Sequence, residues 1–223
     1  MRHPNTTAAP GRPAAAADRN AREALLSAAA ELFAEHGVAA TTLALIAKRA
    51  GLTPAMVHYY FRNKEQLLDA IVTERIGASI AFVWGPVEPG ADPAKVLGGV
   101  VSRILGVIER MPWIPSVWVR EVLNDGGVLR NRILPHLPLR KIRLMQRAIS
   151  RGQAARRINP DLDPALIGFS MIGLVMLHMA AGRFWAQTFR RKVPTVEHIR
   201  RHVTALLLHG LEGSGTSESS PPK

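Results

Sequence analysis

The sequence predicts an all-α protein, with short helices near the N-terminus followed by a larger domain of longer helices. Apolar residues make up 47% of the 223 residues and aromatic residues only 5%, a composition typical of helical globular proteins. Apolar side chains recur at helical spacing along the chain, and no segment keeps the period-two alternation of a strand. Glycine and proline residues separate the helical segments.

Composition also disfavours several classes of protein. The chain has no cysteine, which rules out disulfides and thiolate metal ligands. Its N-terminus has no apolar segment of signal-peptide length, so we expect a cytoplasmic protein. Residues 165–182 carry no formal charge and reach the lower length limit of a membrane span, but they include three glycines, a serine and a histidine. We therefore expect a helix buried on most sides, and no membrane partner.

The first helix is predicted from about Asp18 to His36, because apolar side chains recur there at helical spacing and Gly37 follows as a stop signal. Residues 1–18 are rich in proline and alanine and lack periodicity. We expect them to form a flexible arm.

The next two helices are short and are hinged at Gly51. Either Thr41 or Thr42 can cap the first of them, since both stand directly before its apolar face. Thr53 followed by Pro54 combines an N-cap with a first-turn proline and predicts the start of the second.

A fourth helix is expected from Asn63, which can act as its cap, to about Phe82. After a turn-rich break, further helices are predicted at about 93–110, 113–124, 127–134, 138–156, 163–189 and 195–211. The final residues are rich in serine, glycine and proline and are expected to be disordered.

Two helices joined by a tight glycine turn form the helix-turn-helix plan, whose second helix enters the major groove of DNA. Ala47 and Ala50 are small at the point where the two helices would cross. Val57 and Phe61, four residues apart, would give the second helix its inward face. This phase directs outward the side chains of Pro54, Ala55, His58 and Tyr59.

The order "TT…IAKRAGLT…YYF.NKEQLL" closely resembles the DNA-binding domain of the tetracycline-repressor (TetR) family of bacterial regulators. The similarity covers about Arg22 to Ile71 and includes the preceding segment "LLSAAAELFAEHG". The rest of the chain is similar to the family only in size and helical character. The resemblance implies a DNA-binding regulator whose C-terminal helices bind a small molecule and dimerise.

The resemblance also implies roles for individual residues. Thr41 or Thr42, at a helix N-terminus, would hydrogen-bond to a DNA phosphate. Tyr59 and Tyr60 occupy positions where the family has aromatic contacts to DNA, although Tyr60 could instead pack against the first helix. Lys64 corresponds to the family's phosphate-clamping lysine.

Other positions depart from the family or allow two interpretations. Thr53 either contacts a phosphate or only caps its helix, and Arg12 could reach a minor groove. His58 stands where the family usually has tyrosine, while Ala44 and Leu45 replace positions that are commonly polar. The predicted DNA-binding residues are Thr41, Thr42, Thr53, Pro54, Ala55, His58, Tyr59, Tyr60 and Lys64.

Two segments rich in methionine and aromatic residues, 111–122 and 169–185, suit an adaptable apolar pocket, although such residues more often belong to a core. The candidate pocket residues are Trp118, Met145, Phe169, Met176 and His178. The last two helices are similar to the paired helices that form the four-helix dimer interface of the family.

The net charge of +12 is unevenly distributed. Residues 76–160 carry 13 lysines and arginines against 5 acidic residues, a surplus of +8, whereas residues 1–75 carry 9 against 7. The basic run from Arg130 to Arg157 is most simply a solvated helix face. An anionic ligand and non-specific attraction to DNA are the alternatives.

The sequence thus predicts a homodimeric TetR-like regulator, a repressor that binds a palindromic double-stranded operator and is released by a small-molecule effector. The alternative is a DNA-organising protein that uses the same domain without an effector. We expect no enzyme, cofactor, catalytic residue or metal site, because no clustered carboxylates, ligand spacing or phosphate loop is visible. The expected parts are a flexible arm (1–18), a helix-turn-helix domain (19–66), a ligand-binding and dimerisation domain (67–212) and a disordered tail (213–223).

Overall fold

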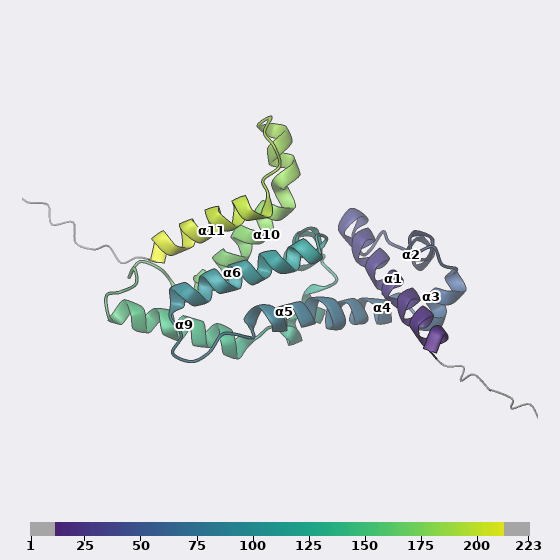
Figure 1. The fold of residues 1–223 in the computed structure, drawn as a ribbon, viewed down its shortest axis with the longest axis horizontal. Coiled ribbons are helices and arrows are strands. Elements are labelled where there is room, and N and C mark those ends of the chain that lie inside the picture. The colour runs from purple at the N-terminus through teal and green to yellow at the C-terminus, as the bar shows by residue number, and fades with distance from the viewer. Residues whose placement is uncertain (1–11, 212–223) are drawn as a thin grey trace, which may run out of the picture. The chain divides into compact units, whose positions relative to one another are not determined.

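The computed structural model describes residues 12–211, and the regular elements in this range are helices with no β-strand (Figure 1). The predicted all-α fold is therefore confirmed for this part of the chain. The protein is divided into two compact units, Met1–Ile71 and Val72–Lys223. The first unit contains α1 (Arg12–His36), α2 (Leu43–Arg49), α3 (Pro54–Tyr60) and α4 (Lys64–Ile71).

The first helix begins earlier than the sequence predicted. It starts at Arg12, so residues 12–18 are helical instead of belonging to a flexible arm. Pro13 lies in the first turn, where proline is well tolerated, and the four alanines that follow favour a helix. The remainder of the predicted arm, residues 1–11, and the predicted tail, residues 213–223, lie outside the described residues.

The first unit is built around α1, whose Leu25, Leu32 and Phe33 are buried. Helices α2 and α4 each pack on α1, and α3 packs on α2. The unit extends to Ile71, whereas the sequence placed a boundary after residue 66. The reason is that α4 buries one face in this core. Among the buried side chains that follow α1 in this unit are Ile46, Ala47, Val57, Phe61, Leu67, Leu68 and Ile71.

The turn between α2 and α3 depends on Gly51, whose φ of +68° lies in the left-handed region. Leu52 N–H donates to the carbonyl oxygen of Ala47 at 2.9 Å and so closes the end of α2. Thr53 then caps α3, because its hydroxyl oxygen accepts from Met56 N–H at 3.4 Å. The predicted hinge and the predicted start of α3 are both confirmed.

The second unit begins with a π-helical segment, η1, that follows α4 directly in the chain. Helices α10 and α11 pack on α6, and α9 packs on both α6 and α10. The elements are η1 (Val72–Gly77), α5 (Ala78–Trp84), α6 (Pro93–Arg110), α7 (Ile114–Val117), η2 (Trp118–Leu123), α8 (Arg130–Ile133), η3 (Leu134–His136), α9 (Leu139–Ala154), α10 (Pro164–Thr188) and α11 (Val196–Leu211).

The predicted helix at 113–124 consists of a short α-helix followed by the π-helical segment η2. The predicted helix at 127–134 is α-helical only from Arg130. Gly127 explains the delay, since a Cβ atom at this position would lie 2.3 Å from the carbonyl oxygen of Glu121. Such a close approach of two backbone segments is compatible with a turn and not with a continuous helix.

Helix α10 is much less buried than the sequence predicted. Met171 and Val175 pack into the core, whereas Leu166, Leu177 and Phe184 on the same helix are exposed. Helix α10 is long and apolar enough to cross a membrane, but core helices of soluble proteins can have the same length and composition. In Figure 1 its C-terminal end projects beyond α6 and α11. The expectation of a helix buried on most sides is therefore wrong for a single copy of the chain.

Candidate nucleic-acid interface and apolar cavity

Helix α3 presents one face to solvent and buries the other. Val57 is fully buried and Phe61 is 3% exposed, which fixes the rotation of the helix. The opposite face carries Tyr59, which is 76% exposed. The predicted orientation is confirmed, since the exposed residues of this face are Thr53, Pro54, Ala55, His58 and Tyr59.

The two threonines before α2 have different surroundings. Thr42 is exposed and caps the helix, accepting a hydrogen bond from Leu45 N–H at 3.2 Å. Thr41 is fully buried, and its hydroxyl donates to the carbonyl oxygen of Gly37 at 2.8 Å. Thr41 therefore stabilises the loop before α2, and its predicted phosphate contact is wrong. Thr42 stays the candidate for that contact.

Lys64 does not stand free at the start of α4. Its ammonium group donates to the backbone carbonyl of Val38, in the loop after α1. An ammonium group has three donor hydrogens, so two remain for a phosphate. This bond also connects the start of α4 to the loop that leads into α2.

Tyr60 has a partner that the sequence did not indicate. Its hydroxyl donates to Asp18 Oδ1 at 2.6 Å, which connects α3 to α1 across 42 residues of sequence. The ring of Tyr59 meets that of Tyr60 edge to face, with centroids 5.0 Å apart. Tyr60 is therefore held within the protein and forms a support for the exposed ring of Tyr59.

Arg49, at the end of α2, forms two hydrogen bonds to Glu35 of α1, at 2.9 and 2.7 Å. These bonds lower the pKa of Glu35 and raise that of Arg49. By contrast, the neighbouring Lys48 is exposed on α2. Lys48 is a candidate phosphate contact that was not predicted from the sequence, although the apolar phase of α2 already directed it outward.

An apolar cavity of about 100 Å³ lies within the second unit. Its wall includes Ile76 of η1, Trp118 of η2 and Ile172 of α10. The polar side chains on the wall are few, with Ser79 the clearest. The complete lining is Ile76, Ser79, Ile80, Val83, Trp84, Ile104, Val107, Ile114, Trp118, Leu137, Pro138, Ile142, Ile172 and Met176.

The cavity includes two of the five predicted pocket residues, Trp118 and Met176. Met145 is buried in the core, and Phe169 is 66% exposed. His178 Nδ1 lies 2.6 Å from the carbonyl oxygen of Leu174, one helical turn earlier. These last three residues do not line the cavity. The isoleucines were missed because their pattern in the sequence is that of any core residue.

The fold and the exposed face of α3 define a class, the helix-turn-helix DNA-binding proteins. A model of the family described as bacterial regulatory proteins, tetR family, matches residues 25–71. The transcriptional repressor KstR2 of Mycolicibacterium smegmatis is 36% identical over 165 residues, which is 71% of this chain and 77% of that protein. The chain belongs to the TetR family and is a DNA-binding transcriptional regulator.

Two other curated relatives are regulators. The fatty acid metabolism regulator protein of Bacillus subtilis is 30% identical over 151 residues, 68% of this chain and 77% of that protein. The match to the transcriptional regulator BetI of Rhizobium meliloti is 38% identical over 98 residues, but it covers 44% of this chain and spans only 48% of that protein.

Solved structures share the fold over almost the whole chain. The ketosteroid transcriptional regulator KstR2 of Mycobacterium tuberculosis is 21% identical, with a TM-score of 0.67 over 86% of this chain and 94% of that one. AibR in complex with isovaleryl coenzyme A and operator DNA is 23% identical, with a TM-score of 0.63 over 84% and 98%. FadR of Bacillus subtilis in complex with stearoyl-CoA is 21% identical, with a TM-score of 0.60 over 85% and 99%.

The bond between Tyr60 and Asp18 raises the pKa of the Tyr60 hydroxyl from 10.0 to about 12. The folded protein thus holds this proton more tightly than the unfolded chain does. The bond stabilises the fold fully below pH 10, and this stabilisation is lost as the pH rises to about 12.

The tyrosinate absorbance tests this assignment, because Tyr59 and Tyr60 are the only two tyrosines of the chain. In Tyr59→Phe the absorbance reports Tyr60 alone, and we expect a midpoint near pH 12. Adding Asp18→Asn should lower that midpoint, since the amide is a weaker acceptor and has no charge. An unchanged midpoint after Asp18→Asn would contradict the bond.

Proposed function

We propose that this regulator is a homodimeric repressor that works in the bacterial cytoplasm. It binds a palindromic operator through α3 and is released by a coenzyme A thioester whose acyl chain enters the apolar cavity. The observation that carries the proposal is the combination of an exposed recognition face in one unit with an apolar cavity in the other. A regulator needs both, one to bind DNA and one to sense a small molecule.

Helix α3 is the proposed reading element. Its exposed side chains offer the Tyr59 ring and the His58 imidazole for contacts in the major groove. Thr42, at the N-terminus of α2, and Lys64, at that of α4, would bind phosphates on either side. Pro54 and Ala55 leave room for α3 to approach the bases closely.

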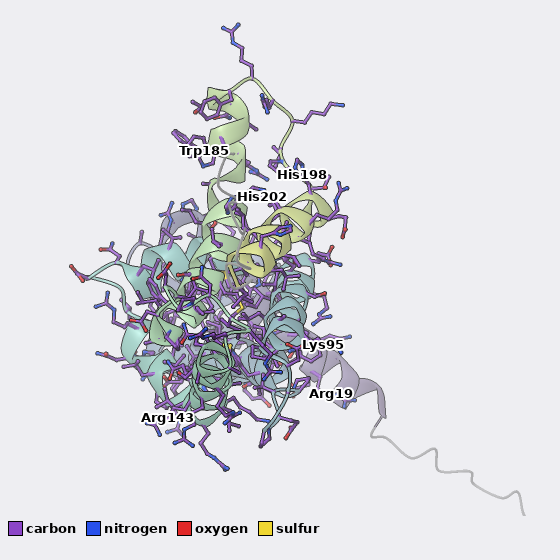
Figure 2. The ribbon with its side chains drawn as sticks, turned by 90° about the vertical axis from the view of Figure 1, so that its left-hand side faces the viewer. Arg19, Lys95, Arg143, Trp185, His198 and His202 are labelled. Atoms are coloured by element: carbon purple, nitrogen blue, oxygen red, sulfur yellow. The ribbon has the colours of Figure 1, made fainter. Side chains whose placement is uncertain are left out.

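The exposed apolar residues of α10 support a homodimer. Leu177 is 60% exposed and Leu206 of α11 is 50% exposed, and these two helices pack against each other. Figure 2 shows Trp185 near the end of the projecting part of α10. A second copy of the same face would cover these side chains and form a four-helix interface. In such a dimer the two α3 helices would read half-sites about 34–36 Å apart.

The cavity is the proposed effector site. Its lining is almost entirely hydrocarbon, which suits an acyl chain. The relatives and structural neighbours include a fatty acid metabolism regulator and regulators solved with stearoyl-CoA and with isovaleryl coenzyme A. The cavity volume of about 100 Å³ suits a short acyl chain better than a long one, and titration with both thioesters tests this preference.

The effect of ligand binding would be transmitted from the cavity to the DNA-binding unit through η1, and the operator would then be released. Ile76 of η1 lines the cavity, and η1 continues directly from α4, which belongs to the DNA-binding unit. The imidazole of His136 packs so closely on Gly77 that a Cβ atom there would lie 2.6 Å from Nδ1. A ligand that favours a different arrangement of this π-helical segment would shift the population of DNA-binding conformations.

The alternative is a DNA-organising protein that needs no effector. The apolar cavity favours the ligand-responsive repressor, because an organising protein has no need of a cavity that contacts η1. A DNA-binding experiment with and without effector distinguishes the two proposals. A repressor prefers one palindrome and dissociates with effector, whereas an organising protein binds all sequences with similar affinity.

Substituting Tyr59 tests the DNA-reading face. A palindromic operator is first selected from a random DNA pool with the wild-type protein, and affinities are then measured by fluorescence anisotropy. We expect Tyr59→Ala to bind it about 5- to 150-fold more weakly, as expected for the loss of one contact worth about 1–3 kcal/mol. Leu134→Ala is the control and should bind normally, because it shortens an exposed apolar side chain of the second unit. Failure to enrich any palindrome would overturn the proposal, as would wild-type affinity in Tyr59→Ala.

Introducing a charge on α11 tests the dimer. We expect the wild-type chain to sediment as a dimer and Leu206→Glu to sediment as a monomer, because a buried unpaired carboxylate opposes association. Leu134→Glu is the control, because Leu134 is 53% exposed and belongs to η3, which is not part of the proposed interface of α10 and α11. A dimeric Leu206→Glu, or a monomeric wild type, would argue against this interface.

Filling the cavity tests the effector site. We expect Met176→Trp to bind the operator normally but to need at least about tenfold more isovaleryl-CoA or stearoyl-CoA for release, because the indole occupies the acyl space. Met145→Leu is a volume-conserving core change outside the cavity and should respond like the wild type. If Met176→Trp is released at the wild-type concentration, the cavity is not the effector site.

A further inference from the structure

The outer face of α9 carries a line of exposed arginines at helical spacing. We call Arg140, Arg143, Arg147 and Arg151 the arginine stripe. At 3.6 residues per turn, the four positions fall within about 80° of one another and extend over about 16 Å of the helix. Met145, Ile149 and Gly152 point to the opposite side and are buried. The stripe is therefore held at the surface by a helix that the core fixes in rotation.

No acidic side chain neutralises the stripe. Helix α9 contains no aspartate or glutamate, and within the described residues its four arginines form no ion pair or side-chain hydrogen bond. Lys141 on the same helix behaves differently. Its ammonium group donates to the carbonyl oxygens of Gly85 and Val87 and to Glu88 Oε1. The lysine thus fixes α9 to the preceding loop, whereas the arginines have no such structural role.

Other arginines of the second unit are used within the protein. Arg130 donates to the carbonyl oxygens of Val122, Leu123 and Asn124, and Arg200 pairs with Glu197 at 3.5 Å. Like charges three and four residues apart destabilise a helix. A line of four unpaired arginines is therefore unfavourable for folding alone and calls for an anion outside the chain.

We propose that the arginine stripe is a second DNA contact, which binds backbone phosphates without regard to sequence. Guanidinium groups bind phosphate oxygens in a planar, bidentate geometry, and four in a line suit a polyanion better than a small ligand. DNA presents its phosphates in a line, whereas the coenzyme A of the proposed effector carries its phosphates in one compact head group. The contact holds the protein near DNA during the search for its operator and adds a salt-dependent term to its affinity.

The surroundings of the stripe favour DNA over a protein or a membrane. Protein interfaces need a buried apolar or aromatic centre, and no aromatic residue occurs on α9. A membrane-bound amphipathic helix inserts its apolar face, but the apolar face of α9 is covered by α6 and α10. Figure 2 shows Arg143 at the surface of the molecule. What the stripe offers to a partner is charge alone.

The test measures non-specific binding, which requires neither the operator nor the effector. Affinity for a random-sequence duplex of roughly 40 base pairs is followed between 50 and 200 mM salt for the wild type and for Arg143→Gln/Arg147→Gln. Loss of two phosphate contacts should reduce the slope of log K against log salt by about 1.8. Over this range the wild type should then lose about twelvefold more affinity than the variant. Glutamine and arginine have similar helix propensities, so the variant should keep its helical circular dichroism.

The control is Lys95→Gln/Arg120→Gln, which removes the same charge from exposed positions outside α9. A wild-type slope in the control together with a reduced slope in the stripe variant supports the proposal. Equal reductions in both variants would overturn it, because net charge alone would then explain the effect. An unchanged slope in the stripe variant overturns it as well.

A separate measurement tests whether the partner of the stripe is an anionic membrane instead of DNA. Binding to phosphatidylserine vesicles is measured for the same three proteins. If the stripe variant loses vesicle binding while its DNA slope stays that of the wild type, the partner is an anionic lipid surface and the DNA proposal is wrong. Because the duplex has random sequence, these results stand independently of whether Tyr59→Ala weakens operator binding.

Discussion

The burial of Val57 and Phe61 is the constraint on which the DNA-binding face depends. Helix α3 has only seven residues, fewer than an isolated helix needs to be stable in water. Its rotation is therefore set by the core that receives these two side chains. Tyr59 lies two residues after Val57, on the opposite side of the helix, and is exposed for that reason. Any change that rotates α3 would move every reading side chain together.

Three contacts fix the position of this short helix. Gly51 allows the tight turn from α2, the Thr53 hydroxyl satisfies a free N–H of the first turn, and Tyr60 is held by Asp18 of α1. The bond between Arg49 and Glu35 connects α2 to the same helix. The reading helix is thus preorganised on α1, so little conformational entropy is lost when DNA binds.

Much of this unit could be predicted from the sequence, because the signals are local. The Thr53–Pro54 pair and the four-residue spacing of Val57 and Phe61 lie within a turn or two of the features they determine. The bond from Tyr60 to Asp18 could not be predicted in this way. It connects residues 42 positions apart, and no periodicity reports a contact of that kind.

The second unit was harder to predict from the sequence, because more of its features depend on contacts between distant segments. Its helix boundaries follow proline and glycine signals, but a cavity is a property of several helices at once. Trp118 and Met176 line it, whereas Met145, with a similar apolar pattern, fills the core. Helix α10 was expected to be buried because it is apolar, yet hydrophobicity does not specify which molecule covers it. In the proposed homodimer, a second copy of the chain would cover its exposed Leu177.

The positively charged side chains discussed above fall into two groups, according to whether they have a partner within the protein. Arg49, Lys64 and Lys141 each donate to an acidic side chain or a backbone carbonyl and hold elements together. The arginines of the stripe have no such partner among the described residues, and they lie in the part of the chain where the positive surplus is largest. Charge that the fold does not neutralise is available to a partner. Net charge alone could not separate these groups, because the separation depends on which side chains the packing brings together.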